Sequence, residues 1–101
     1  MLQRVVFKIK PETMKEYLEW SKGAIDYWRK RPGFKEMRAY REPGTSRVLL
    51  DIEFENFESW GKAYDDPKLK EILSTFASYT YEGKTGLWDT SPVIPKPLKP
   101  L

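Results

Sequence analysis

The segment RVLLDIEFENFESW, residues 47–60, decides the fold because a strand pattern in it passes directly into a helix pattern. Val48, Leu50, Ile52 and Phe54 alternate with residues of the opposite face, and this period of two predicts a half-buried strand. Asn56, the only asparagine in the chain, then suits a helix N-cap, where its side chain accepts a backbone N–H that would otherwise stay unpaired. We therefore expect a strand-to-helix junction here.

The chain after this junction predicts a helix and a final strand. Phe57, Trp60 and Tyr64 recur at helical spacing. Asp66 suits an N-cap and Pro67 a first helical position, and this pair predicts that the helix restarts there. The apolar stripe continues to Ala77. The segment TYEGKTGLW, residues 80–88, predicts the last strand, in which two glycines either weaken the strand or mark bulges.

The chain before the junction predicts a strand, a helix and the first arm of a hairpin. VVFKIK, residues 5–10, alternates as a strand, and Pro11 opens a helix that Pro32-Gly33 ends. FKEMRAYR, residues 34–41, is a weaker strand, and Pro43-Gly44 suits a type II turn into the segment at 47. One helical stripe of the first helix collects its apolar residues: Met14, Tyr17, Leu18, Ile25 and Trp28.

The order of elements is βαββαβ, which predicts an α+β, ferredoxin-like fold: an antiparallel sheet with two helices on one face. We assign residues 1–91 to this domain and residues 92–101 to a proline-rich C-terminal arm, which is either loose or docked on the same or another subunit. The other face of the sheet is expected to be bare. It would carry a mixture of apolar and charged residues: Arg4, Val6, Lys8, Arg38, Leu49, Asp51 and Glu53.

The 101-residue chain contains no cysteine and no histidine. Their absence removes disulfides, thiolate nucleophiles, zinc sites of the usual kind and imidazole bases. The net charge of +3 is mild, which argues against a face built for a polyanion. We therefore expect no cofactor, no metal site and no nucleic-acid partner.

The sequence also lacks the marks of membrane targeting. Its N-terminus has no signal-peptide pattern, and no segment approaches the roughly 20 apolar residues of a membrane helix. We expect a cytoplasmic protein without a membrane partner. One asparagine, one glutamine and 33% charged residues resemble the composition of heat-adapted proteins, which predicts thermostability.

Two other proteins of this topology fit poorly. In an RNA-recognition motif the third strand stacks bases on aromatic rings, whereas RVLLDIEF has Leu49 and Asp51 at the stacking positions. An aspartate there would repel phosphates. An acylphosphatase needs a glycine-rich loop after the first strand, where this chain has Pro11.

Three features of the sequence carry a resemblance to a known family: the strand–helix pattern, RPGF at residues 31–34 and EFENFESWGKAYDDPKLKEI at residues 53–72. In these features the sequence resembles the dimeric α+β barrel superfamily, in particular its antibiotic-biosynthesis-monooxygenase-like and NIPSNAP-like domains. The resemblance covers about residues 2–90. It implies a homodimer in which two sheets pack face to face, each subunit holding a pocket between sheet and helices. The haem-degrading members' first-strand asparagine and second-helix histidine have no counterpart here, so the resemblance implies no haem degradation.

Two groups of residues are candidates for a site. Tyr17, Trp28, Trp60 and Tyr64 are expected to bind a flat organic ligand, or else to be ordinary core. Asp51 and Glu53 lie two apart on one strand face, and with Arg38 they are the candidate catalytic groups, for proton transfer; the alternative is an ion network with Arg4, Lys8 and Arg38.

Three functions are compatible with these residues. The first is a homodimer that binds a hydrophobic or aromatic small molecule, with a cofactor-independent monooxygenase-like activity. The second is a ligand-binding protein without catalysis, and the third is an assembly module whose arm engages another chain. A pocket that contains a titratable group favours the first function, and a pocket without such a group favours the second. A filled core together with an ordered arm favours the third.

Overall fold

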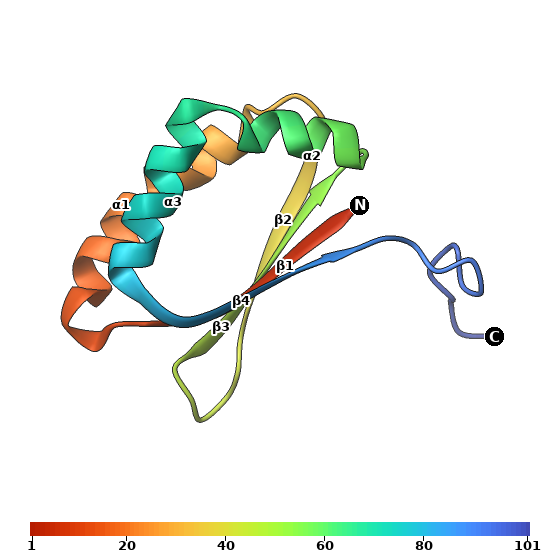
Figure 1. Ribbon diagram of the computed structural model, residues 1–101. Coiled ribbons are helices and arrows are strands. Elements are labelled where there is room, and N and C mark those ends of the chain that lie inside the picture. Colours follow the sequence, from red (N-terminus) through yellow and green to blue (C-terminus); the bar gives the residue numbers. More distant parts are fainter.

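The computed structural model describes residues 1–101 and confirms the predicted order of elements. The strands are β1 (Leu2–Ile9), β2 (Phe34–Arg41), β3 (Arg47–Phe54) and β4 (Thr80–Trp88), and the α-helices are α1 (Met14–Arg29), α2 (Phe57–Tyr64) and α3 (Pro67–Tyr79). A 3-10 turn, η1 (Pro11–Thr13), leads into α1. The four strands form one antiparallel sheet in the order β2-β3-β1-β4, and all the helices cover the same face of it (Figure 1). This is the predicted ferredoxin-like α+β fold.

The second helical segment breaks where the sequence predicted. Asn56 caps α2 by accepting a hydrogen bond from the Ser59 amide at 2.9 Å. Asp66 caps α3 in the same way, accepting from the Lys68 amide at 2.9 Å, with Pro67 as the first helical residue. The break lets α3 turn away from α2 and run beside α1 (Figure 1).

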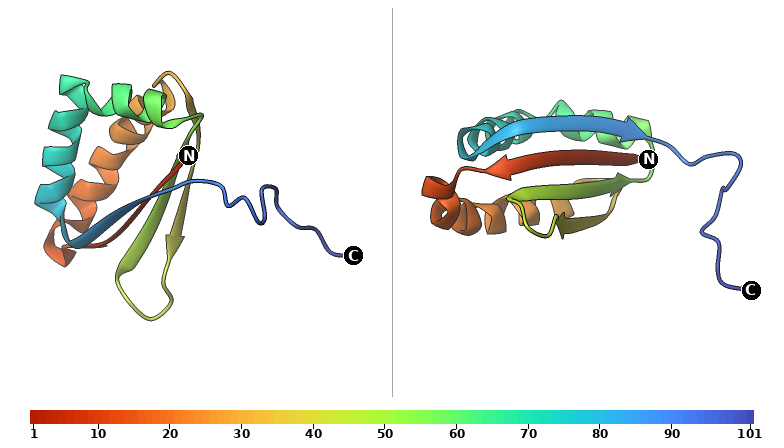
Figure 2. Two further views of the ribbon diagram at one scale, coloured as in Figure 1. Left: turned by 45° about the vertical axis from the view of Figure 1, so that its right-hand side comes forward. Right: turned by 90° about the horizontal axis from the view of Figure 1, so that it is seen from below.

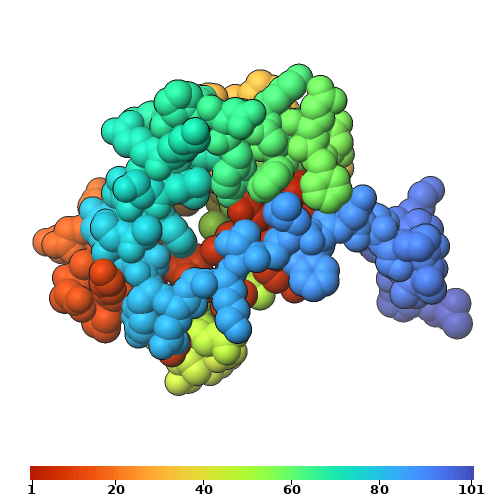
Figure 3. Space-filling model, in the orientation of Figure 1, coloured from red at the N-terminus to blue at the C-terminus, as the bar shows by residue number.

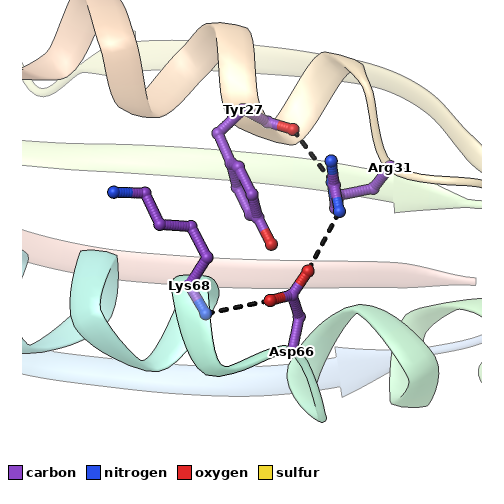
Figure 4. A network of polar contacts seen from close by, with 4 residues as sticks. All are labelled: Tyr27, Arg31, Asp66 and Lys68. Carbon is purple, nitrogen blue, oxygen red and sulfur yellow. Dashed lines mark hydrogen bonds and ion pairs between the residues drawn. The ribbon is translucent and has the colours of Figure 1, made fainter.

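A polar network joins α1 to the start of α3 (Figure 4). The Arg31 guanidinium pairs with the Asp66 carboxylate at 3.0 Å and lies over the Tyr27 ring, 4.1 Å from its centroid. The buried Tyr27 hydroxyl points toward that carboxylate. This hydroxyl and the Lys68 amide hold the pKa of Asp66 below its usual range. The network therefore links the end of α1 to the start of α3.

Two glycines have the positive φ that other residues rarely adopt, and one of them also lacks room for a side chain. Gly44 has φ +79°, and the Thr45 amide donates to the Glu42 carbonyl at 3.3 Å, as a type II turn requires. Gly33 has φ +81°, and a Cβ on it would lie 2.4 Å from the Cβ of Ser59 in α2. The RPGF segment therefore lets the chain pass directly under α2 before β2 begins.

The arm beyond Trp88 forms no helix or strand and runs away from the body of the molecule (Figure 2). Its side chains Val93 and Leu98 are 84% and 78% exposed. None of the helices is both long enough and apolar enough to cross a membrane.

The core is small for a chain of this length. Only 10 of 101 residues are buried, among them Phe7, Phe54 and Leu69, which are almost inaccessible. Leu18 and Ile25, which we placed on the inward stripe of α1, are 54% and 42% exposed. They are exposed because the helices stand off the sheet, and the space beneath them is not filled.

Candidate functional site

A cavity of about 680 Å³ lies between the inner face of the sheet and the helices, and 20 of its 23 lining residues are hydrophobic. The surface is visibly hollowed between the helical layer and strands β1 and β4 (Figure 3). Leu18 and Ile25 of α1 and Leu87 of β4 line the cavity and are also substantially exposed. The cavity is therefore open to solvent at its edges.

The alternation of the strands supplies the floor of the cavity. Residues of β1 and β3 that face the helices belong to its lining: Gln3, Val5, Phe7, Ile9, Val48, Leu50 and Ile52. Register places these sets side by side, since Val5 pairs with Leu50 and Gln3 with Ile52. The helices supply the roof, mostly as large side chains.

The four aromatic residues that the sequence singled out all lie in the cavity wall. Trp28, Trp60 and Tyr64 form one group, in which the ring of Tyr64 lies 4.7 Å from that of Trp60 and 5.8 Å from that of Trp28. Tyr17 belongs to a second group with Phe7 and Phe76, at 6.3 and 6.4 Å. The rings thus gather at two places on the wall instead of closing over the space between.

Gln3 is the polar group of this cavity, and we did not predict it. Its side chain is 4% exposed. The amide oxygen accepts from Trp60 Nε1 at 3.1 Å, and the amide nitrogen donates to the Tyr64 hydroxyl. The sequence held a signal for it: the period-two pattern of Val5, Phe7 and Ile9, extended back by one step, places the only glutamine of the chain on the inner face.

No charged side chain lines the cavity. Its titratable groups are the phenols of Tyr17 and Tyr64. Burial raises the pKa of both, and the hydrogen bond from Gln3 acts in the opposite sense on Tyr64. Both phenols are therefore protonated at neutral pH, and the cavity offers hydrogen bonds but no anionic base.

The structure places Arg38, Asp51 and Glu53 on the opposite face of the sheet, in a shallow depression with Glu36 and Tyr40. Asp51 accepts two hydrogen bonds from Arg4, at 2.8 and 2.9 Å, and this pairing raises the pKa of the guanidinium. Arg38 pairs with Glu36 at 3.2 Å.

Glu53 pairs with Lys35 at 3.6 Å. All three candidate catalytic residues are therefore engaged in ion pairs, and the sheet separates them from the cavity. Within one chain they cannot serve as polar partners for a ligand held by Tyr17, Trp28, Trp60 and Tyr64. No group of three or more acidic side chains lies close enough together to hold a metal ion.

A second depression, of about 380 Å³, lies between the α1–β2 connection and α2. Only one of its ten lining residues is hydrophobic, and two of its charged groups, Arg31 and Asp66, already pair with each other. The apolar cavity is the better candidate for a ligand site because it is larger and its wall is continuous apolar surface.

Comparison with known proteins identifies the fold. No protein-family model matches the sequence, and no curated protein sequence matches it. Among solved structures, the N63A mutant of SnoaB, a cofactor-independent oxygenase from Streptomyces nogalater, is similar with a TM-score of 0.81 and 12% identity, over 94% of this chain and 96% of that one.

Two further structures agree with this likeness. An antibiotic biosynthesis monooxygenase has a TM-score of 0.75 and 15% identity, over 91% of this chain and 100% of that one. A conserved protein from Methanosarcina mazei Go1 has a TM-score of 0.71 and 22% identity, over 85% of this chain and 89% of that one. The chain has the fold of the antibiotic-biosynthesis-monooxygenase-like proteins, as the resemblance in its sequence implied.

The Gln3–Trp60 hydrogen bond gives the first prediction. Trp60→Phe leaves the buried Gln3 oxygen without a donor, so we expect the free energy of unfolding to fall by about 1–3 kcal/mol. Gln3→Met alone should also destabilise the protein, since it leaves the indole N–H of Trp60 without an acceptor. Because the double variant removes both the indole N–H and the amide oxygen, neither partner of this bond is left unpaired. Its loss should therefore be smaller than the sum of the single losses, by about 1 kcal/mol. Urea unfolding of all four proteins measures this, and strict additivity would contradict the bond.

Proposed function

We propose that this protein is a homodimer that binds a neutral, hydrophobic small molecule, such as a compound of two or three fused rings, in the cavity between sheet and helices. The observation that carries the proposal is the cavity itself. At about 680 Å³ it falls within the range of ligand pockets, roughly 300–1,000 Å³, and like them it combines an apolar wall with few polar groups.

The chemistry of the wall supports a neutral ligand. A charged group moved from water into this lining would lose its hydration without meeting an opposite charge, which is strongly unfavourable. The aromatic groups around Tyr17 and Tyr64 favour flat rings, since aromatic pairs gain energy beyond the area they bury. We therefore assign the role of enclosing the ligand to four aromatic residues: Tyr17, Trp28, Trp60 and Tyr64.

Cofactor-independent oxygenation is the second candidate function, and the fold shared with SnoaB favours it. Such an enzyme would act on a substrate held in the same cavity. The only titratable groups of the lining are the phenols of Tyr17 and Tyr64, whose pKa burial raises, so neither can take a proton from a substrate at neutral pH, and this argues for the simpler role. We therefore place ligand binding first and catalysis second.

The open face of the sheet supports the homodimer. It presents apolar side chains beside the ion pairs of Arg4, Asp51 and Glu53, including Val6 and Leu49, which pair directly across β1 and β3. At the rim, Tyr40 and Trp88 are 50% and 58% exposed. A face that mixes apolar residues with charges of both signs can be complementary to a second copy of itself.

A bulky side chain at Ala24 tests the cavity. Ala24 lines it from α1, whereas Ala77 on α3 is exposed outside it. We expect the neutral fluorescent probe N-phenyl-1-naphthylamine to bind the unaltered protein, and Ala24→Phe to weaken binding at least about tenfold by filling the site.

Ala77→Phe, the same change outside the cavity, should leave the affinity unchanged. Probe binding that survives Ala24→Phe in a folded protein would contradict the proposed site.

An oxygen electrode distinguishes the two candidate functions when a polycyclic phenol such as 1-naphthol is the ligand. Binding without oxygen uptake indicates a ligand-binding protein, and uptake with an oxygenated product indicates an oxygenase.

A charge on the open face tests the homodimer. Leu49→Asp places a carboxylate next to Asp51 on the same face, so two copies would bring like charges together. In sedimentation experiments we expect the unaltered protein to be a dimer and the Leu49→Asp variant to be a monomer. Leu98→Asp, in the arm, where the side chain is 78% exposed, is the matched control and should stay dimeric. A monomeric unaltered protein would contradict the proposed assembly.

A further inference from the structure

The amide of Gln3 lies between two aromatic residues of different hydrogen-bonding character. An indole N–H is a donor only, whereas a phenol oxygen both donates and accepts. Because Trp60 Nε1 lies 3.1 Å from one end of the amide, that end must be the carbonyl oxygen. The direction of the amide is therefore set by Trp60.

This direction fixes what remains for Tyr64. The amide nitrogen of Gln3 faces the phenol and donates to its oxygen. The Tyr64 oxygen thus acts as an acceptor toward Gln3, and its own proton is left for another partner. No protein group accepts that proton, since the only hydrogen bond of Tyr64 is the one that it accepts from Gln3.

The surroundings make this proton the directed donor of the cavity. Tyr64 and Gln3 both line it, and the only other residues of the lining that are not hydrophobic are Ser21 of α1 and Thr85 of β4. The phenol stays protonated at neutral pH, as burial raises its pKa. A hydroxyl proton without a protein acceptor is free to donate to an acceptor that a ligand brings into the cavity.

We propose that Gln3 is a positioning residue that sets ligand specificity: held by Trp60, it turns the Tyr64 hydroxyl proton into the cavity, so that the site selects neutral ring compounds carrying a hydrogen-bond acceptor, such as a ketone or quinone carbonyl. The inference rests on the proposed function and adds the chemical class of the ligand. A ligand that offers only an N–H or O–H donor would meet a second donor at Tyr64.

Three tricyclic compounds of nearly the same shape test the selection. Fluorenone offers only an acceptor, carbazole only a donor, and fluorene neither. Their affinities can be compared by displacement of N-phenyl-1-naphthylamine. We expect fluorenone to bind the unaltered protein about tenfold more tightly than fluorene, the value of about one net hydrogen bond. Carbazole should bind no better than fluorene.

Two variants separate the donor from the residue that aims it. Tyr64→Phe should bring fluorenone down to the affinity of fluorene. Gln3→Met frees the hydroxyl to rotate, so fluorenone and carbazole should then bind about equally, a change that a merely structural role for Gln3 would not produce. Tyr81→Phe removes a hydroxyl from β4 outside the cavity and should leave the order of the three compounds unaltered.

The outcomes distinguish this inference from the function on which it rests. If neither the probe nor any of the three compounds binds, the proposed function fails and the inference with it. If the three bind the unaltered protein equally, or carbazole binds best, the cavity is a ligand site but the inference about Gln3 and Tyr64 is overturned. A preference for fluorenone that persists in folded Gln3→Met, with carbazole still weak, overturns the role of Gln3.

Discussion

The pairing register of β1 with β3 is the constraint on which the rest of the structure depends. It aligns Val5 with Leu50 and Arg4 with Asp51, so that one face of the sheet is apolar and the other carries ion pairs. A slip of one residue would exchange the two faces of a strand and put charged side chains under the helices. The same register brings Gln3 beneath α2, where Trp60 and Tyr64 meet it.

The helices cover this apolar face without filling the space beneath them. Two aromatic groups, one around Trp28 and Tyr64 and the other around Tyr17 and Phe76, hold the helical layer away from the floor of the sheet. Each group buries large rings against one another, and the space between the two groups stays unfilled. The few fully buried residues and the large cavity are therefore two consequences of one arrangement.

Much of the fold could be predicted from the sequence because its signals are local. The alternation from Val48 to Phe54, the cap at Asn56 and the Asp66-Pro67 restart each depend on neighbouring residues, and the structure has all three. The bulge in β4 also falls near the first of its two glycines, where the register shifts and Glu82 has φ 53°.

The site was harder to predict because it depends on distances between layers. The aromatic residues could be selected by helical spacing, but the size of the gap beneath them is set by how the helices cross the sheet. Asp51 and Glu53 were correctly placed on the bare face, and this placement itself separates them from any pocket under the helices. The alternation of apolar residues becomes recognisable only at Val5, so this pattern alone does not include Gln3.

The central claim is that the space between sheet and helices is an accessible apolar cavity. An apolar cavity of about 150 Å³ is large enough to bind xenon, and bound xenon is visible by its anomalous scattering. A crystal of the protein held under xenon pressure should show xenon between the inner face of β1 and β3 and helix α1, near Val5, Leu50 and Trp28. A crystal without xenon there, with the helices closed down on the sheet and the space filled by side chains, would contradict the account.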